Sequence, residues 1–312
     1  MKTQMLELLI CPICLPKEFP LIADIVTEQN GDIETGSLTC PSCMVSFPIT
    51  DGIANLNPMH EPSTMATNKY ETEAVVASYL WSHFSELTGD EHSSQAYSTW
   101  AEVIEPHNGI ALDAGGAVGR FSFEMSNRSD FSIGLDTSVA FIRVARELMK
   151  KRTLTVGLKD EGSSTKEFTV TLPDRFMSEK VEFIVANALS LPFRENSIGS
   201  FSSLNLVDKV PSPIKHLQEM SRVTRNKEAQ FVLSDPFSWS DEAAPIREWL
   251  GGQPDGPYTG RGIDTISGLL KDPKGTLQPA WKVSEPENVW WKIRTHTNHY
   301  ELIQSCFVHA KR

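Results

Sequence analysis

From residue 109 to the end of the chain, short apolar segments alternate with longer amphipathic ones. The amphipathic segments VAFIRVARELMKK and IKHLQEMSRVT repeat their apolar side chains at helical spacing. Strands that alternate with helices form a parallel sheet covered by helices on both faces. We therefore predict an α/β fold with a doubly wound, mostly parallel, seven-stranded sheet. The expected strands are GIALDAG, FSIGLD, VEFIVANA, IGSFSSLNLV, EAQFVLSDPF, WWKIR and YELIQSCFVHA.

The chain divides into three parts. Residues 1–57 contain short strand-like runs, and residues 58–107 form a connector with a loop-like start and a helical continuation. Residues 108–312 form the α/β domain. Within it, alternating Thr and Val around EGSS predict an inserted hairpin at 153–173, placed to cover the mouth of a pocket.

Four of the five cysteines form two CxxC pairs, separated by 25 residues. Two such pairs suit tetrahedral zinc, and four thiolates leave no open position for catalysis. The alternative is four free or disulfide-bonded cysteines. We interpret the N-terminal segment as mature protein rather than a signal peptide, and we expect a reducing, cytoplasmic location. We predict one structural Zn²⁺ that stabilises a small N-terminal domain. Its ligands are Cys11, Cys14, Cys40 and Cys43. Cys306 falls in a strand-like run and is expected to be a buried apolar residue.

The segment ALDAGGAVGR predicts a strand, a glycine-rich turn and a helix start. Gly115, Gly116 and Gly119 allow the backbone to approach a ligand and the next helix to pack closely. A dinucleotide site is the competing interpretation. Asp113 at the end of the strand would face a pyrophosphate unfavourably, whereas it suits a cationic ligand such as S-adenosylmethionine.

Three further strand ends carry polar side chains, which meet at the carboxyl edge of a parallel sheet. Asp136 is expected to accept hydrogen bonds from ribose hydroxyls, with a helix N-cap as the alternative. Asn187 and Ala188 are expected at the adenine. Asn205 and Asp208 are candidates to orient the methyl acceptor, although Asp208 beside Lys209 also suits a solvated loop.

Two candidate catalytic residues lie near the C-terminus. Arg294 is placed to bind a carboxylate, and Tyr300 shares its strand face. A solvated strand face is the alternative for both. Trp239 is a candidate pocket wall or a core residue. The histidines of the connector region are expected at the surface or in connecting segments: His60, His83, His92 and His107.

Residues 108–312 resemble the Rossmann-like class I S-adenosylmethionine-dependent methyltransferases through DAGGAVG, GLD, NALSLPF and LSDPF. The resemblance implies cofactor contacts at Asp113, Gly115, Gly119, Asp136 and Asn187. Departures are Ala117 at the usual middle glycine, and Asn187 where Asp is common. The segments ALDAGGAVGRFSFEMS, NLVDKVPSP and WWKIRTHTNHYELIQSC are similar to the methyltransferase domain of ovothiol biosynthesis. Residues 1–57 are similar to small zinc-ribbon activators of methyltransferases, through LLICPIC and SFPITDGIANL.

The formal net charge is −11, which argues against a partner bound through its phosphates, and nucleic acid is an unlikely partner. The ribbon alone has two basic and seven acidic side chains. No apolar run is long enough for a membrane helix. We therefore expect a methyltransferase that acts on a small molecule, such as an imidazole nitrogen of a thiol-histidine-like substrate. The alternatives are a protein or RNA acceptor bound by the ribbon, and a non-catalytic binding module. The sequence does not predict the oligomeric state.

Overall fold

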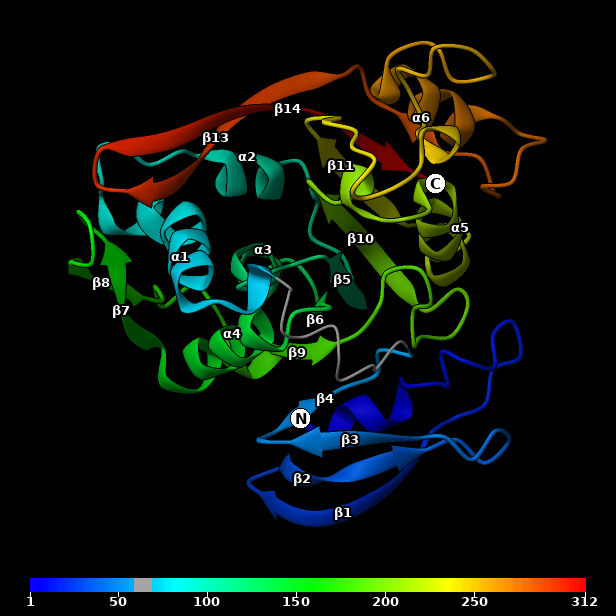
Figure 1. Ribbon diagram of the computed structural model, residues 1–312. Helices are drawn as coiled ribbons and strands as arrows, with labels where there is room; N and C mark the ends of the chain where they lie inside the picture. The colour runs from blue at the N-terminus through cyan, green and yellow to red at the C-terminus, as the bar shows by residue number, and fades with distance from the viewer. Residues whose placement is uncertain (59–68) are drawn as a thin grey trace.

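The computed structural model describes residues 1–58 and 69–312, and His60 lies outside these ranges. The main sheet has the strand order β12-β14-β11-β10-β5-β6-β9, and β13 pairs with β14. This confirms the α/β, mostly parallel fold, with seven strands in line and an eighth added by β13 (Figure 1). The parallel strands are β5 (Ile110–Ala114), β6 (Phe131–Asp136), β9 (Val181–Val185), β10 (Ile198–Leu204) and β11 (Gln230–Asp235). The antiparallel strands are β12 (Lys282–Val283), β13 (Glu287–His296) and β14 (His299–Lys311).

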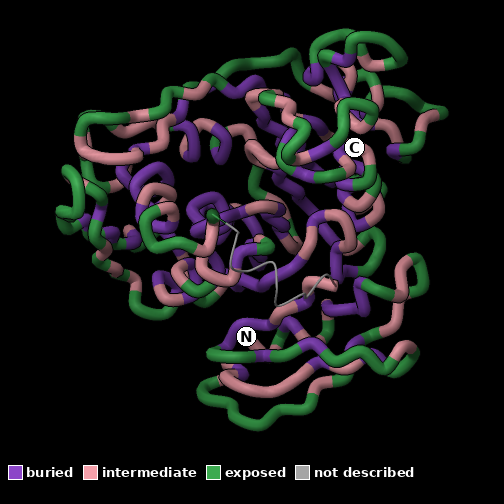
Figure 2. Tube along the Cα trace, viewed as in Figure 1, coloured by how far each residue is buried: buried purple, intermediate pink, exposed green. Residues whose placement is uncertain are grey.

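Helices cover both faces of this sheet. The helices α3 (Arg120–Met125) and α4 (Val139–Lys151) pack on one face. The helices α5 (Pro213–Val223) and α6 (Gly262–Lys271) pack on the other. The helix α4 begins where predicted because the Ser138 hydroxyl accepts a hydrogen bond from the Phe141 N–H at 3.1 Å. Buried residues concentrate between these layers (Figure 2).

The connector folds into two helices, α1 (Glu73–Thr88) and α2 (Ala96–Glu102), preceded by a short 3₁₀ turn at Lys69–Glu71. The β13–β14 hairpin extends beyond the sheet and crosses both helices (Figure 1). Its backbone is tied to α1, because the Ser82 hydroxyl donates to the Lys292 carbonyl at 2.6 Å. The connector is therefore packed between the sheet and this hairpin.

The inserted hairpin is present as β7 (Thr153–Lys159) and β8 (Thr165–Thr171). Its buried side chains Leu158, Phe168 and Val170 belong to the same apolar cluster as the α1 residues Leu80 and Phe84. It supports α1 from outside and contributes no residue to the cavity described below, so the expectation that it covers a pocket mouth is wrong.

The N-terminal domain is a four-stranded antiparallel sheet that follows a 3₁₀ turn at Thr3–Glu7. Its strands are β1 (Ile22–Gln29), β2 (Asp32–Thr39), β3 (Ser46–Thr50) and β4 (Ile53–Ala54). It lies against β9, the edge strand of the main sheet, where the Leu56 N–H donates to the Val185 carbonyl at 2.7 Å. An edge strand covered in this way cannot pair with another chain. Within the described residues, no helix has the length and apolar character needed to cross a bilayer.

Candidate active site and metal centre

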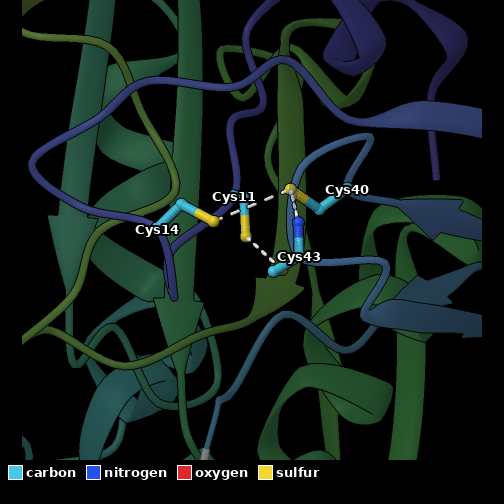
Figure 3. Close-up of side chains that lie close together, drawn as sticks. All are labelled: Cys11, Cys14, Cys40 and Cys43. Atoms are coloured by element: carbon cyan, nitrogen blue, oxygen red, sulfur yellow. Dashed lines mark hydrogen bonds between the residues drawn. The ribbon is translucent and has the colours of Figure 1, made fainter.

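The four cysteines of the two CxxC pairs converge between the loop after the first turn and the β2–β3 loop (Figure 3). Their sulfur atoms all lie within 4.8 Å of one another. The distances are 3.7 Å from Cys11 to Cys43 and 3.8 Å from Cys14 to Cys40. Four sulfurs at ~2.3 Å from a tetrahedral zinc lie about 3.8 Å apart, so the cluster fits the ion. All five cysteines are free of disulfides, and Cys306 is buried in β14 as expected.

A cavity of about 250 Å³ opens along the carboxyl ends of β5, β6, β9 and β10. This is the edge where ligands bind in open parallel sheets. Residues that directly follow, or end, each of these strands line it, among them Gly115, Asp136, Asn187, Ala188 and Asn205. The structure therefore brings together five of the predicted site residues.

The glycine-rich turn has two separate roles. Gly115 lines the cavity with φ of +72°, and a Cβ there would lie 2.8 Å from the Leu206 side chain. Gly116 and Gly119 are not among the residues that line the cavity. A Cβ at Gly119 would lie 2.5 Å from the Phe183 ring, so this glycine allows α3 to pack closely on β9.

Asp113 lies beneath the turn rather than in the cavity. Its carboxylate accepts hydrogen bonds from the hydroxyls of Ser122 at 3.0 Å and Ser202 at 2.9 Å. Burial raises the pKa of Asp113 to about 6, although both serines act to lower it. Asp113 is therefore held by the two serines and is not among the residues that line the cavity, and its contact with the cofactor stays a prediction.

Asp136 and Asn187 line the cavity, and the side chain of each already accepts hydrogen bonds from backbone N–H groups. The Asp136 carboxylate accepts N–H bonds from Ser138 at 2.9 Å and Ala117 at 3.1 Å. Burial raises the pKa of Asp136 to about 6, against the lowering effect of these N–H groups. The Asn187 side-chain oxygen accepts the Leu189 N–H at 2.9 Å, which leaves its NH₂ group for other partners.

Aromatic side chains from the two connector helices and from the β13–β14 hairpin also line the cavity. Tyr79 and His83 come from α1, Tyr97 from α2, and Trp291 from β13. The Tyr97 hydroxyl and His83 Nε2 lie 2.6 Å apart, and their rings are 4.4 Å apart. Sequence reasoning missed these residues, and the expectation of a surface or connecting position is wrong for His83, which is 4% exposed.

The tyrosine–histidine pair is uncharged. Burial lowers the pKa of His83 to about 3, helped by the charge of Arg120. Burial also raises the pKa of Tyr97 well above its ordinary value. This side of the cavity therefore presents neutral rings near the sheet edge.

Asp208 lies behind the cavity, in the 3₁₀ turn Val207–Lys209. Its carboxylate accepts the Ser238 N–H at 2.8 Å and contacts the Lys209 ammonium at 3.1 Å. The same turn brings it to Asp235, whose carboxylate accepts the Asp208 N–H at 3.3 Å. Burial, then the nearby charge of Asp208, raises the pKa of Asp235. The solvated alternative for Asp208 is wrong, because its side chain is fully buried.

The structure does not bring Arg294 and Tyr300 to this cavity. The Arg294 guanidinium donates to the Thr297 hydroxyl at 2.8 Å, and the Tyr300 ring packs against Trp81 at 5.3 Å. Both lie on the part of the β13–β14 hairpin that extends past the sheet. Trp239 lines a second cavity of about 560 Å³, together with Arg261 and Cys306.

Two families match the chain. Residues 2–52 match the Trm112p-like protein family, and residues 112–229 match the methyltransferase domain family. The chain therefore contains an S-adenosylmethionine-dependent methyltransferase domain. The four-cysteine cluster lies in the segment that matches the Trm112p-like family, and its geometry fits a zinc ion.

Several solved structures resemble this methyltransferase. The YcgJ protein of Bacillus subtilis is 12% identical and aligns over 70% of this chain and 98% of its own, with a TM-score of 0.47. A methyltransferase of Methanosarcina mazei is 18% identical, over 68% and 95%, with a TM-score of 0.41. A complex that contains the Haloferax volcanii Trm112 methyltransferase activator is 17% identical, over 51% and 60%, with a TM-score of 0.35. No curated protein gives a significant match.

Proposed function

We propose that this methyltransferase acts on a small molecule, and that its acceptor atom is an imidazole nitrogen of a thiol-histidine-like compound. The observation that carries the proposal is the aromatic wall of the cavity. Tyr79, Tyr97 and Trp291 line a cavity of about 250 Å³ together with the residues at the strand ends. Flat faces of this kind suit a planar ring, and so small a space suits a metabolite better than a macromolecular surface.

The cofactor belongs at the strand-end side of the same cavity. Gly115, Ala117, Asp136, Asn187 and Ala188 are the proposed contacts, because they line the cavity at the ends of β5, β6 and β9. Bound there, S-adenosylmethionine supplies the methyl group. Asp136 would accept the ribose hydroxyls, and the NH₂ group of Asn187 would donate to the adenine.

The chemistry asks mainly for positioning. A neutral imidazole has an ordinary pKa near ~6.5, so a nitrogen lone pair is available at neutral pH without a strong base. Rings on the wall and Asn205 at the sheet edge would hold this nitrogen in line with the methyl group. The neutral state of His83 and Tyr97 is consistent with this role, because neither group adds charge beside an uncharged ring.

The ribbon, in this proposal, stabilises the catalytic domain and does not recognise the acceptor. Its core residues Met5, Leu9 and Phe47 belong to the same apolar cluster as Leu112 and Ile133 of the main sheet. Its acidic composition also argues against RNA, the partner considered above. A protein acceptor is the alternative that the experiment must address.

The test is methyl transfer from labelled S-adenosylmethionine to mercaptohistidine, with histidine, bulk RNA and a protein extract as parallel acceptors. We expect label on mercaptohistidine. Asp136→Ala should reduce the transfer, whereas Asp174→Ala, at an exposed position, should not. Label on the protein extract alone would replace the small-molecule proposal with the alternative.

A further inference from the structure

Asn205 occupies a special position at the carboxyl end of β10. Its backbone is left-handed, with φ of 56°, and its N–H donates to the Ser234 carbonyl of the neighbouring strand at 2.6 Å. Its side chain lines the cavity beside Leu206, which packs on Gly115. The backbone therefore fixes the position from which the Asn205 side chain extends, next to the glycine-rich turn.

Ser305 of the β13–β14 hairpin contacts this amide, and Trp291 of the same hairpin contacts Ser305. The indole Nε1 of Trp291 donates to the Ser305 hydroxyl oxygen at 3.0 Å. The Ser305 hydroxyl donates to Oδ1 of Asn205 at 2.7 Å. Ser305 is fully buried, and Trp291 is 6% exposed.

This chain of hydrogen bonds has one direction. An indole N–H can only donate, so the Ser305 oxygen accepts from it and the Ser305 proton is free to continue to Asn205. With the amide reversed, the Asn205 NH₂ group and the indole N–H would both point at the Ser305 oxygen. The buried Ser305 proton would then lose the acceptor that it has among the described residues, and buried hydroxyls are rarely left unpaired.

We propose, building on the function proposed above, that Trp291 and Ser305 are positioning residues that keep the NH₂ group of Asn205 turned to the cavity. The site then selects an acceptor with a lone-pair group beside its nucleophilic atom, such as a carboxylate, a thiolate or an unprotonated ring nitrogen. An acceptor that presents an ammonium or another N–H at this point meets a donor and is disfavoured. Neither residue touches the reacting atoms in this scheme.

The orientation itself is tested on the wild-type protein, with asparagine and tryptophan labelled with ¹⁵N and S-adenosylhomocysteine bound. We expect no cross-relaxation between the Trp291 indole proton and the Asn205 amide protons, because these protons point away from Ser305. A strong cross-peak between them would overturn the proposal, since it requires the reversed amide. This measurement needs no acceptor, so it stands even if mercaptohistidine is not methylated.

The effect on specificity is tested with Ser305→Ala and its matched variant Ser305→Thr, which keeps the hydroxyl. We expect Ser305→Ala to raise the acceptor KM about tenfold while kcat changes less, because the Asn205 amide is free to reverse. Ser305→Thr should restore the KM. Both variants should bind S-adenosylhomocysteine within about twofold of the wild type, which reports that they are folded. Asn205→Asp, which replaces the donor with an acceptor of the same shape, should lose more acceptor affinity than Ser305→Ala. Equal KM values for all these variants would contradict the proposal.

Discussion

Burial sets the protonation of the titratable side chains around the cavity. It raises the pKa of Asp113 and Asp136 to about 6 and lowers the pKa of His83 to about 3 and of His216 to about 4. The two kinds of shift oppose one another in their effect on acid stability. Below pH ~6.5 the neutral histidines favour the unfolded chain, whereas the raised carboxyl pKa values favour the folded one.

We expect Asp136→Ala to weaken the binding of S-adenosylhomocysteine by about tenfold, because the ribose hydroxyls lose their acceptor and tenfold corresponds to ~1.4 kcal/mol. Titration calorimetry measures this, with the exposed Asp174→Ala as the control. Unchanged affinity in Asp136→Ala would remove the ribose assignment.

His216 offers a test of the lowered histidine pKa. Its Nε2 lies 2.8 Å from the Ser203 hydroxyl, and its ring is fully buried between β10 and α5. The unfolded chain binds a proton at His216 below pH ~6.5, whereas the folded chain does not until about pH 4. From pH 7 to pH 5, the free energy of unfolding of the wild type should therefore fall by about 2 kcal/mol. The His216→Gln variant should not show this decrease. Urea unfolding at the two pH values checks this, and a constant difference between the two proteins would contradict it.

Strands and helices with a clear local pattern of apolar residues could be predicted from the sequence. Strands β5, β6 and β9 are short apolar runs bounded by turns, and α4 has one apolar face, so each follows from local sequence. The site residues Asp136, Asn187 and Asn205 follow from the same pattern, because parallel strands share one carboxyl edge.

The aromatic wall was not predictable in this way. Helix α1 buries Ser82, His83 and Ser85 as well as its apolar residues, so spacing does not indicate which face packs where. Its partner Lys292 is 210 residues away along the chain. Similarly, alternation along a single strand predicts that Arg294 and Tyr300 share one face, but the chain turns between them. Arg294 lies on β13 and Tyr300 opposite it on β14, and the pattern does not say how far this hairpin extends beyond β11. Their proposed role in binding the acceptor stays a prediction.

The inserted hairpin should act through α1. Phe168 is 9% exposed and packs in the apolar cluster of α1, so Phe168→Ala should lower the free energy of unfolding by about 3 kcal/mol. The neighbouring Thr169 points outward and is exposed, so Thr169→Ala should change it by less than about 0.5 kcal/mol. Chemical unfolding distinguishes the two. Equal effects would mean that the hairpin does not support the connector.

At the scale of the whole molecule, the ribbon and the catalytic domain share one apolar core. Zinc binding should therefore stabilise the whole chain and not the ribbon alone. We expect one zinc per wild-type chain by elemental analysis, and a single thermal transition. Cys40→Ser should lose the metal and unfold at a lower temperature throughout, whereas Cys306→Ser, which changes a buried cysteine outside the cluster, should keep it. If the catalytic domain of the zinc-free protein unfolds at the same temperature as in the wild type, zinc stabilises the ribbon alone and the prediction is wrong.

The polar contact between the two domains is centred on Arg146 of α4. Its guanidinium binds the Asp32 carboxylate of the ribbon at 2.8 and 2.9 Å, and it also pairs with the fully buried Glu182 of β9. Burial acts to raise the pKa of Asp32. Its hydrogen bonds with the Met1 amino group and Lys150, and the charge of Arg146, outweigh this and hold the pKa well below its usual value.

A carboxyl group whose pKa is lowered by folding stabilises the folded state above its unfolded pKa of ~3.9, and this contribution is lost as the pH falls below that value. Asp32→Asn should therefore cost about 2 kcal/mol at neutral pH, less than for a fully buried pair because the Asp32 side chain is 18% exposed. The cost should be fully present near pH 5 and should shrink below about pH 4. Glu28→Gln, at an exposed position on β1, is the matched control and should have little effect at any pH. Unfolding curves across this range decide the matter. If the cost is unchanged at pH ~3, where Asp32 is largely protonated in the unfolded chain, its charge is not the cause. Asp32 would then stabilise the contact of the two domains through packing.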